Sequence, residues 1–159
     1  MKVVAAAAVV APRQRLFDAL NDRGVLRRCI PGCEELTEEG TAAYRVRLKL
    51  GIAGLTGRYA GTATHQDVHT PESFTIAFDG KGKTGFVHGT ASVSITDDEG
   101  IARVACEADV QVGGAIAAVG SRLMVAVARK LTRDFFRRVA AEIGADPDLP
   151  ECAEEAAAE

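Results

Sequence analysis

Three histidines are the side chains of this 159-residue chain whose type best suits acid–base or metal chemistry. His65 and His69 are four residues apart, but they fall in a strand-and-turn segment, where that spacing does not bring two side chains together as it would on a helix. His88 alternates with Phe86 and could enter an interior cavity as a polar partner for a ligand; the alternative is an edge or surface histidine. No spacing indicates a Ser/His/Asp or Cys/His arrangement, so we expect no catalytic residues.

The tripeptide Gly82-Lys83-Thr84 matches the end of a phosphate-binding loop. The complete motif needs a glycine where Ala77 stands, and a helix whose N-terminus faces the phosphates. Here Gly85 leads into a strand pattern instead. We therefore predict a glycine-rich hairpin turn with solvated lysines, and no nucleotide site.

The four cysteines are Cys29, Cys33, Cys106 and Cys152. Only Cys29 and Cys33 are close in sequence, whereas a structural zinc site needs two close-set pairs of ligands. We expect no metal site, and instead two free, semi-buried thiols on either side of the Pro31-Gly32 turn. This cysteine usage weakly favours a reducing cytoplasm.

The composition excludes several classes of protein. The net charge of −3 lacks the basic excess of a nucleic-acid binder, and no apolar run reaches the ~20 residues of a membrane-spanning helix. The N-terminal apolar run ends at Pro12 and Arg13 without a polar cleavage region, which favours a first strand over a signal peptide. Although 47% of the residues are hydrophobic, only 5% are aromatic and none is Trp. Many side chains are therefore too small to fill a wide interior.

Hydrophobic periodicity predicts the elements that must position these residues. An edge strand over residues 2–11 is followed by two short helices, one beginning at Pro12 and one capped by Asp22 and closed by Ile30-Pro31-Gly32. Some six strands come next, among them the segments 44–50, 55–68, 74–78, 86–96 and 101–112. After Gly113 and Gly114, apolar residues recur every three or four positions, which predicts one amphipathic helix of about thirty residues and ~45 Å.

An extended antiparallel sheet must cover its apolar face, and the C-terminal helix is the one element long enough to do so. We predict a single α+β domain over residues 1–145, with a curved antiparallel sheet wrapped around that helix. Residues 146–159 are acidic and unpatterned, which predicts a disordered tail. Gly120 then falls within the helix, where it could allow close packing of a strand, leave room for a ligand, or simply be tolerated.

Three stretches resemble a known family, namely 19–33, 82–89 and 109–123. The third is the most specific, because its two glycines precede a helix start of the Val-Gly-Ser-Arg-Leu type. Together with the element order, these stretches resemble the carbon monoxide dehydrogenase G-subunit family of the START-like (SRPBCC) helix-grip superfamily over residues 1–144. The resemblance implies a START/Bet v1-like fold with a hydrophobic cavity between the sheet and the long helix.

The same resemblance implies a function. It implies no covalent cofactor, but a bound isoprenoid quinone such as menaquinone, or a lipid, as the ligand. It also implies a role in membrane recruitment of, or electron transfer from, a molybdenum-containing CO dehydrogenase-type oxidoreductase. Some members of the family continue into a C-terminal extension that meets the membrane, whereas the tail here is too short and too acidic to insert.

Large apolar side chains on the predicted inner faces, with a few polar ones, are our candidates for the lining of the cavity. They are Leu48, Leu50, Tyr59, Phe74, Ile76, Phe78, Phe86, His88, Ile116, Val119, Gly120, Leu123 and Val127. The alternative is that these residues form a plain, filled core. The candidate gates are Ile30–Gly32 and the hairpin at 80–85, because short helices and glycine-rich turns move at low cost.

A basic stripe on the long helix is either a solvated face or a contact surface for anionic lipid or an acidic partner; it comprises Arg122, Arg129, Arg133 and Arg137. We expect a non-catalytic carrier in the cytoplasm or peripheral to the inner face of the cell membrane, binding no nucleic acid and able to dimerise through a sheet edge. Two alternatives stay open: a ligand-free assembly subunit with a filled core, and a cyclase- or hydrolase-like enzyme of the same superfamily that uses Tyr59 and His88.

Overall fold

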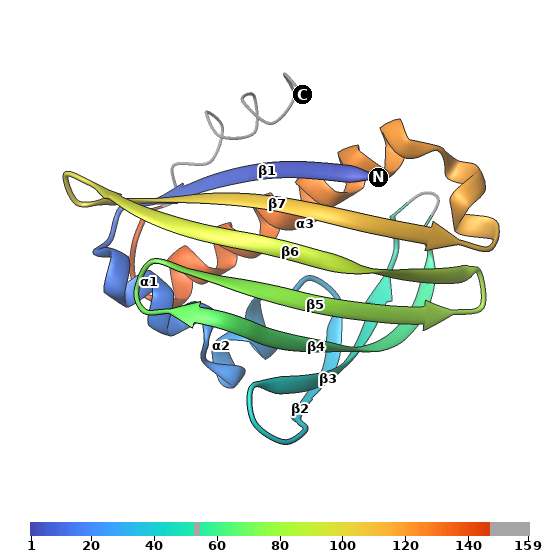
Figure 1. The fold of residues 1–159 in the computed structure, drawn as a ribbon, viewed down its shortest axis with the longest axis horizontal. Coiled ribbons are helices and arrows are strands. Elements are labelled where there is room, and N and C mark those ends of the chain that lie inside the picture. Colours follow the sequence, from blue (N-terminus) through green and yellow to red (C-terminus); the bar gives the residue numbers. More distant parts are fainter. Residues whose placement is uncertain (53–54, 147–159) are drawn as a thin grey trace.

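A curved antiparallel sheet of seven strands wraps around one long helix in the computed structural model, which describes residues 1–52 and 55–146 (Figure 1). The strand order is β1-β7-β6-β5-β4-β3-β2, so β1 and β2 form the two edges. The strands are β1 (Lys2–Val9), β2 (Cys33–Glu38), β3 (Ala43–Leu50), β4 (Gly57–His69), β5 (Ser73–Gly82), β6 (Gly85–Asp98) and β7 (Ile101–Gly113). The predicted architecture and the edge position of the first strand are confirmed.

Two short helices, α1 (Arg13–Leu20) and α2 (Arg23–Cys29), connect β1 to β2. The Asp22 carboxylate caps α2 by accepting a hydrogen bond of 3.1 Å from the Val25 N–H, as predicted. Ile30 is extended and ends this helix before Pro31. A 3-10 helix, η1 (Ala115–Val119), leads into α3 (Ser121–Glu142), which packs against β1, α2 and α1.

The prediction of one uninterrupted C-terminal helix is wrong, because the helical conformation is interrupted at Gly120. This residue has φ 92° and ψ 150°, a backbone conformation that is essentially restricted to glycine. A Cβ atom at this position would meet nothing within 4 Å, so close packing of a strand does not explain the glycine. The 22 residues of α3 span ~33 Å, which is shorter than predicted.

Strand β2 is not among the strands that the sequence pattern predicts. Its sequence Cys-Glu-Glu-Leu-Thr-Glu contains a single buried side chain, that of Leu36, so it lacks a readable alternation. It pairs with β3 along one edge only, and most of its side chains are exposed to solvent. The short, polar sequence is therefore typical of an edge strand.

Two glycines in the middle of the sheet allow it to curve. A Cβ atom on Gly61 of β4 would overlap the Asp79 backbone, and one on Gly89 of β6 would overlap the Asp109 carbonyl. Neighbouring strands can approach this closely only where no side chain intervenes, which is how glycines permit strong local bending of a sheet.

The two ends of the sheet are filled differently. The end that carries the β4–β5 and β6–β7 turns, which we call the closed end, packs tightly against α1: Leu16 and Ile95 are at most 1% exposed. The opposite end, which we call the open end, carries the β3–β4 connection, the β5–β6 turn and η1. Its cluster has four buried members surrounded by partly buried apolar residues.

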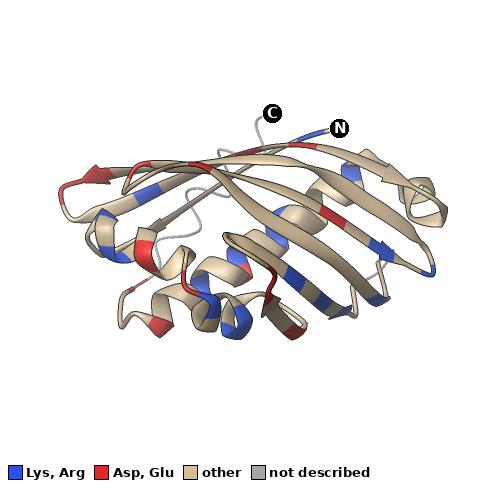
Figure 2. Cartoon of the chain, turned by 60° about the horizontal axis from the view of Figure 1, so that its bottom comes forward, with Lys and Arg blue, Asp and Glu red and all other residues tan. Residues whose placement is uncertain are grey.

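Charge also differs between these ends. Figure 2 shows acidic residues at the turns of the closed end and basic residues at the strand ends of the open end, with further basic residues on the helices. None of the helices in the described part of the chain contains a stretch long and apolar enough to cross a membrane.

Candidate functional site

The register of the strands decides which candidate residues face α3. Leu48 lies on the same face of β3 as the buried Tyr44, and it pairs with Tyr59 on β4. Phe78 lies on the same face of β5 as the buried Phe74. Paired residues and alternate residues point to the same side of a sheet. The candidates on the inner face of these strands are therefore Leu48, Leu50, Tyr59, Phe74, Ile76 and Phe78.

The structure brings only part of the candidate set together. One cluster at the open end contains Leu50, Tyr59, Ile116, Val119 and Val127, packed with Leu55 and Met124. Phe74 and Ile76 belong instead to the closed-end cluster. Leu48 and Phe78 are partly buried and belong to none of the clusters formed by the described residues.

Phe86 and His88 lie on the outer face of β6, so the prediction that they enter the interior is wrong. Phe86 is 41% exposed, and its ring stacks on that of exposed His88 with centroids 5.7 Å apart. The buried Ile95 shares its face of the strand with Val87, which packs into the open-end cluster. Over the whole strand the outer alternation is Phe, His, Thr, Ser, Ser and Thr, whereas the inner one is Val, Gly, Ala, Val and Ile. The full alternation therefore identifies the buried face, and only the aromatic character of Phe86 was misleading.

Leu123 also departs from its predicted place. Because the helix starts only after Gly120, Leu123 falls in the first turn of α3 and is 41% exposed. Its neighbour Met124 points into the open-end cluster instead.

His65, which the sequence pattern does not place in the cavity, is the histidine on the inner face of the sheet. It lies six residues after Tyr59 on β4, and this even spacing is the signal that would have identified it. Its ring makes edge-to-face contacts with Tyr44 and Phe74, at centroid distances of 5.5 and 5.0 Å. Burial lowers the pKa of His65 below its ordinary value of 6.5, which favours the neutral imidazole.

We expect His65 to make folding less favourable in acid. Because the pKa is lower in the folded chain, the unfolded chain takes up this proton first as the pH falls through 6.5, and the free energy of unfolding decreases until the folded pKa is passed. Urea denaturation at about pH 7.5 and about pH 5.5 should show a smaller difference for H65Q than for the wild type. H69Q removes an exposed histidine and should keep the wild-type difference. An equal change in both variants would contradict the assignment to His65.

Hydrogen bonds tie three elements together at the open end. The Tyr59 hydroxyl lies 3.0 Å from the Thr84 Oγ1, in the β5–β6 turn. The Thr84 carbonyl accepts a 2.9 Å hydrogen bond from the Ile116 N–H of η1. The predicted gate at 80–85 is thus the part of this hairpin that contacts η1, and its opening stays a prediction. The other predicted gate is held to β3 by a 2.8 Å bond from the Lys49 N–H to the Gly32 carbonyl.

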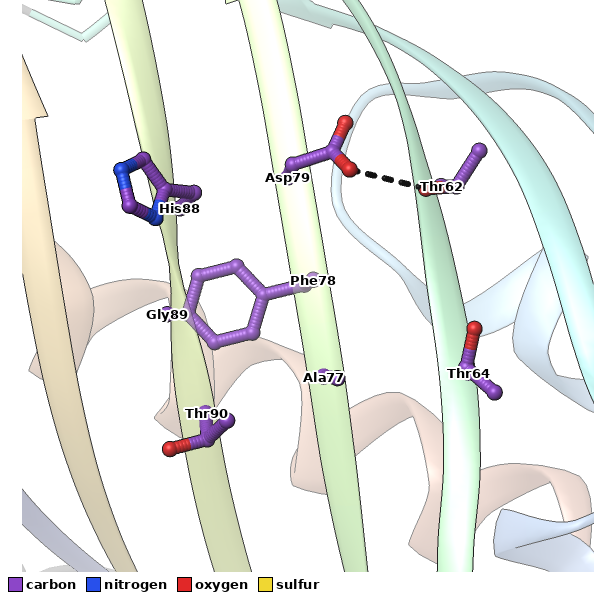
Figure 3. A pocket seen from close by; sticks show the side chains of 8 residues that line it. All are labelled: Thr62, Thr64, Ala77, Phe78, Asp79, His88, Gly89 and Thr90. Atoms are coloured by element: carbon purple, nitrogen blue, oxygen red, sulfur yellow. Dashed lines mark hydrogen bonds between the residues drawn. The ribbon is translucent and has the colours of Figure 1, made fainter.

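The outer face of β4, β5 and β6 carries a depression of about 400 Å³, drawn in Figure 3. It is lined by Thr62, Thr64, Ala77, Phe78, Asp79, His88, Gly89 and Thr90. The Thr62 hydroxyl donates a 3.1 Å hydrogen bond to the Asp79 carboxylate. This hydroxyl-rich, solvent-exposed lining does not suit an apolar ligand.

The cysteines of the described residues are free thiols. Cys33 is partly buried, as predicted, whereas Cys29 is fully buried, and burial raises the pKa of both. Cys106 keeps some solvent contact, but burial of its thiol raises the pKa to about 12. Protonated thiols are poor nucleophiles and metal ligands. Cys152 and most of the predicted tail lie outside the described residues.

Neither the Cys29 and Cys33 pair nor the Gly82-Lys83-Thr84 tripeptide forms a site that the structure supports. In the part of the chain that the structure describes, no three His, Cys, Asp or Glu side chains converge. Lys83 and Thr84 form the turn between β5 and β6, so the predicted hairpin is confirmed, and no helix follows it.

The basic stripe of α3 is not uniform. Arg122 and Arg137 are exposed, whereas Arg129 and Arg133 are partly buried. Asp134 pairs with Arg137 at 3.6 Å, so the C-terminal half of the stripe contains an internal counter-charge. Arg122 lies at the open end and has no acidic residue nearby on its helix.

Comparisons with known proteins agree with this geometry. A family model described as the carbon monoxide dehydrogenase G subunit (CoxG) matches residues 6–144. No curated protein matches the chain. A conserved protein from Geobacillus kaustophilus has a similar structure, with a TM-score of 0.87 and 27% identity over 91% of this chain and 95% of that one.

More distant structures share the fold alone. A START superfamily protein from Mycobacterium smegmatis has a TM-score of 0.67 at 10% identity, covering 90% of this chain and 97% of that one. Ara h 8.0201 has a TM-score of 0.63 at 11% identity, also covering 90% and 97%. The architecture is therefore the START/Bet v1-like fold.

Proposed function

Because the chain belongs to the carbon monoxide dehydrogenase G-subunit (CoxG) family, we propose that it carries a hydrophobic ligand between α3 and the inner face of the sheet. The observation that carries the proposal is the incomplete burial of the inner face. Apolar side chains on this face stay partly exposed although α3 covers the sheet; they include Leu48, Leu50, Tyr59, Phe78, Val87 and Val112. A core that served stability alone would pack these side chains closely.

The chemistry of the lining supports an isoprenoid quinone such as menaquinone, or a similar lipid. Small residues make the wall between the two ends, since Gly61 pairs with Gly80 and Phe78 pairs with Gly89. On this proposal, the ligand lies along this wall, beside the Phe78 ring. The Tyr59 hydroxyl at the open end and a neutral His65 further in can each donate a hydrogen bond to a quinone carbonyl.

A carrier role agrees better with the geometry than an enzymatic one. The family is named for a component of carbon monoxide dehydrogenase, which supports an accessory role beside a molybdenum-containing oxidoreductase. The catalytic alternative relied on Tyr59 and His88, but these side chains lie on opposite faces of the sheet and do not share a site. The quinone would then accept electrons from the partner enzyme and exchange with the pool at the inner face of the cell membrane.

Native mass spectrometry of the purified full chain, with solvent extraction, tests the proposal. We expect a bound species that is released by organic solvent and has the absorbance of a quinone, when the host makes menaquinone. The control is the same extraction from protein refolded without lipid and then mixed with menaquinone, which should recover the bound species. Protein that co-purifies with no lipid or quinone, and takes up none when mixed, would favour the ligand-free assembly subunit.

A further inference from the structure

We infer that the open end is a docking surface for an anionic lipid bilayer, which the molecule approaches end-on. The surface consists of an apolar tip, made of Phe86, η1 and Leu123, and of the surrounding cations Lys49, Arg58, Lys81, Lys83 and Arg122. Three observations support it: the exposure of the tip, the sign of the charges around it, and their separation from the acidic residues.

The tip exposes apolar side chains that a soluble face would not need. Phe86 and Leu123 are each 41% exposed, and they flank η1, whose three exposed residues are alanines. The Phe86 ring lies directly over Gly113, beside the start of η1. No charged residue occurs between positions 108 and 122 other than Asp109. A group of this kind can enter the interfacial region of a bilayer without burying a charge.

The charges around the tip are almost all positive. The segments 49–58, 80–86 and 110–124 contain five Lys or Arg residues and no Asp or Glu. All five cations are exposed. Arg58 forms an ion pair with Glu34 at 3.2 Å, which lies outside these segments. Cations placed around an apolar tip match the headgroups of anionic lipids, which attract basic residues near the surface.

Five acidic residues gather at the other end of the same strands, whereas Glu34, Asp79 and Asp109 lie nearer the open end. The β4–β5 and β6–β7 turns carry Asp67, Glu72, Asp97, Asp98 and Glu99. Strands of 13 residues separate these turns from the open end, a distance of roughly 40 Å. This exceeds the Debye length of ~10 Å, so a bilayer at the open end would hardly sense the acidic turns. The net charge of −3 therefore does not prevent docking, and the separation orients the molecule (Figure 2).

The docking surface surrounds an end of the interior where several apolar side chains are only partly buried. Partly buried Leu50, Ile52, Tyr59 and Val119 lie at the same end. On the proposed function, an apolar ligand could pass between the bilayer and the inner face of the sheet without crossing bulk water. The docking itself depends only on the surface, whether or not a ligand is bound.

Vesicle flotation of the full chain, stripped of lipid, tests this inference. The vesicles contain phosphatidylcholine, with or without about 30% phosphatidylglycerol, and we expect binding only to the anionic ones. K81Q/K83Q should weaken that binding roughly twenty- to thirtyfold, the product of two lysines near an anionic surface. L123S should weaken it by removing an exposed apolar group. Melting curves check that each variant folds.

The matched control is R13Q/R15Q, which removes the same charge from α1 at the closed end and should bind as the wild type does. Equal weakening by both double variants would overturn the inference, as would absence of binding to anionic vesicles. Capture of an acidic protein that depends on Lys81 and Lys83, without vesicle binding, would likewise overturn it and assign the surface to a protein partner. The quinone extraction above uses no vesicles, so either experiment can fail while the other succeeds.

Discussion

Replacement of Phe74 by alanine is expected to lower the free energy of unfolding by about 3–5 kcal/mol. Phe74 is 4% exposed in the closed-end cluster, and its ring contacts Phe17 edge-to-face at a centroid distance of 5.7 Å. Removing the ring leaves a cavity that α1 and β6 cannot fill, because both are held by other buried side chains. Urea denaturation followed by circular dichroism measures the change.

Phe78 provides the matched control. It lies on the same strand and the same face, four residues from Phe74, but it is only partly buried and belongs to none of the clusters of described residues. We expect F78A to lower the free energy of unfolding by about 1 kcal/mol or less, because little apolar area is lost from a packed environment. Equal costs for the two variants would mean that the interior is packed at both ends, which is the filled core of the assembly-subunit alternative.

A tryptophan in place of Val87 should reduce the amount of bound menaquinone at least tenfold. Val87 lies on the inner face of β6, packs against the open-end cluster and is partly buried. In a filled core such an enlargement would cost about 1–3 kcal/mol of stability. At the open end, the added ring should instead occupy the space of the ligand, and the free energy of unfolding should stay close to that of the wild type. Solvent extraction measures the first quantity and urea denaturation the second.

The neighbouring variant H88W adds the same ring to the outer face. His88 is exposed, so this change should alter neither the bound menaquinone nor the stability appreciably. Loss of menaquinone in H88W, with retention in V87W, would show that the ligand lies on the outer face of the sheet. Unfolding of V87W with an unchanged ligand content per folded molecule would also contradict a ligand site beside Val87.

Local sequence patterns were sufficient to predict most of the strands and helices. The alternation of Val46, Leu48 and Leu50 with three basic residues identified both the strand and its inner face, since only one face of β3 is apolar. Asp22 and Pro31 marked the two ends of α2, because capping and the restriction of the residue before proline act within a few residues. These signals require no knowledge of distant contacts.

The errors have separate causes. Phe86 was predicted to lie inside because it is aromatic, although the alternation of Val87, Val93 and Ile95 marks the opposite face of β6 as the buried one. His65 was missed because histidine is a polar residue, although its even spacing from Tyr59 on β4 places it on the inner face. Gly120 appeared to fall within a helix because its backbone conformation, and not its neighbours, interrupts the helical pattern.

By itself, the amino-acid sequence determined how few large side chains are available for the interior, and it predicted that the interior would be poorly filled. Few aromatic residues and many Ala, Val and Gly leave volume behind in any fold that wraps a wide sheet around a helix. Only the tertiary structure decided which end of the interior keeps partly buried apolar side chains. The close approach of neighbouring strands at Gly61 and Gly89 and the end of the helix at Gly120 affect how α3 lies against the sheet. Side chains of α1, α2 and the C-terminal half of α3 fill the closed end. Such placement depends on contacts between residues far apart in the chain, which no local pattern records.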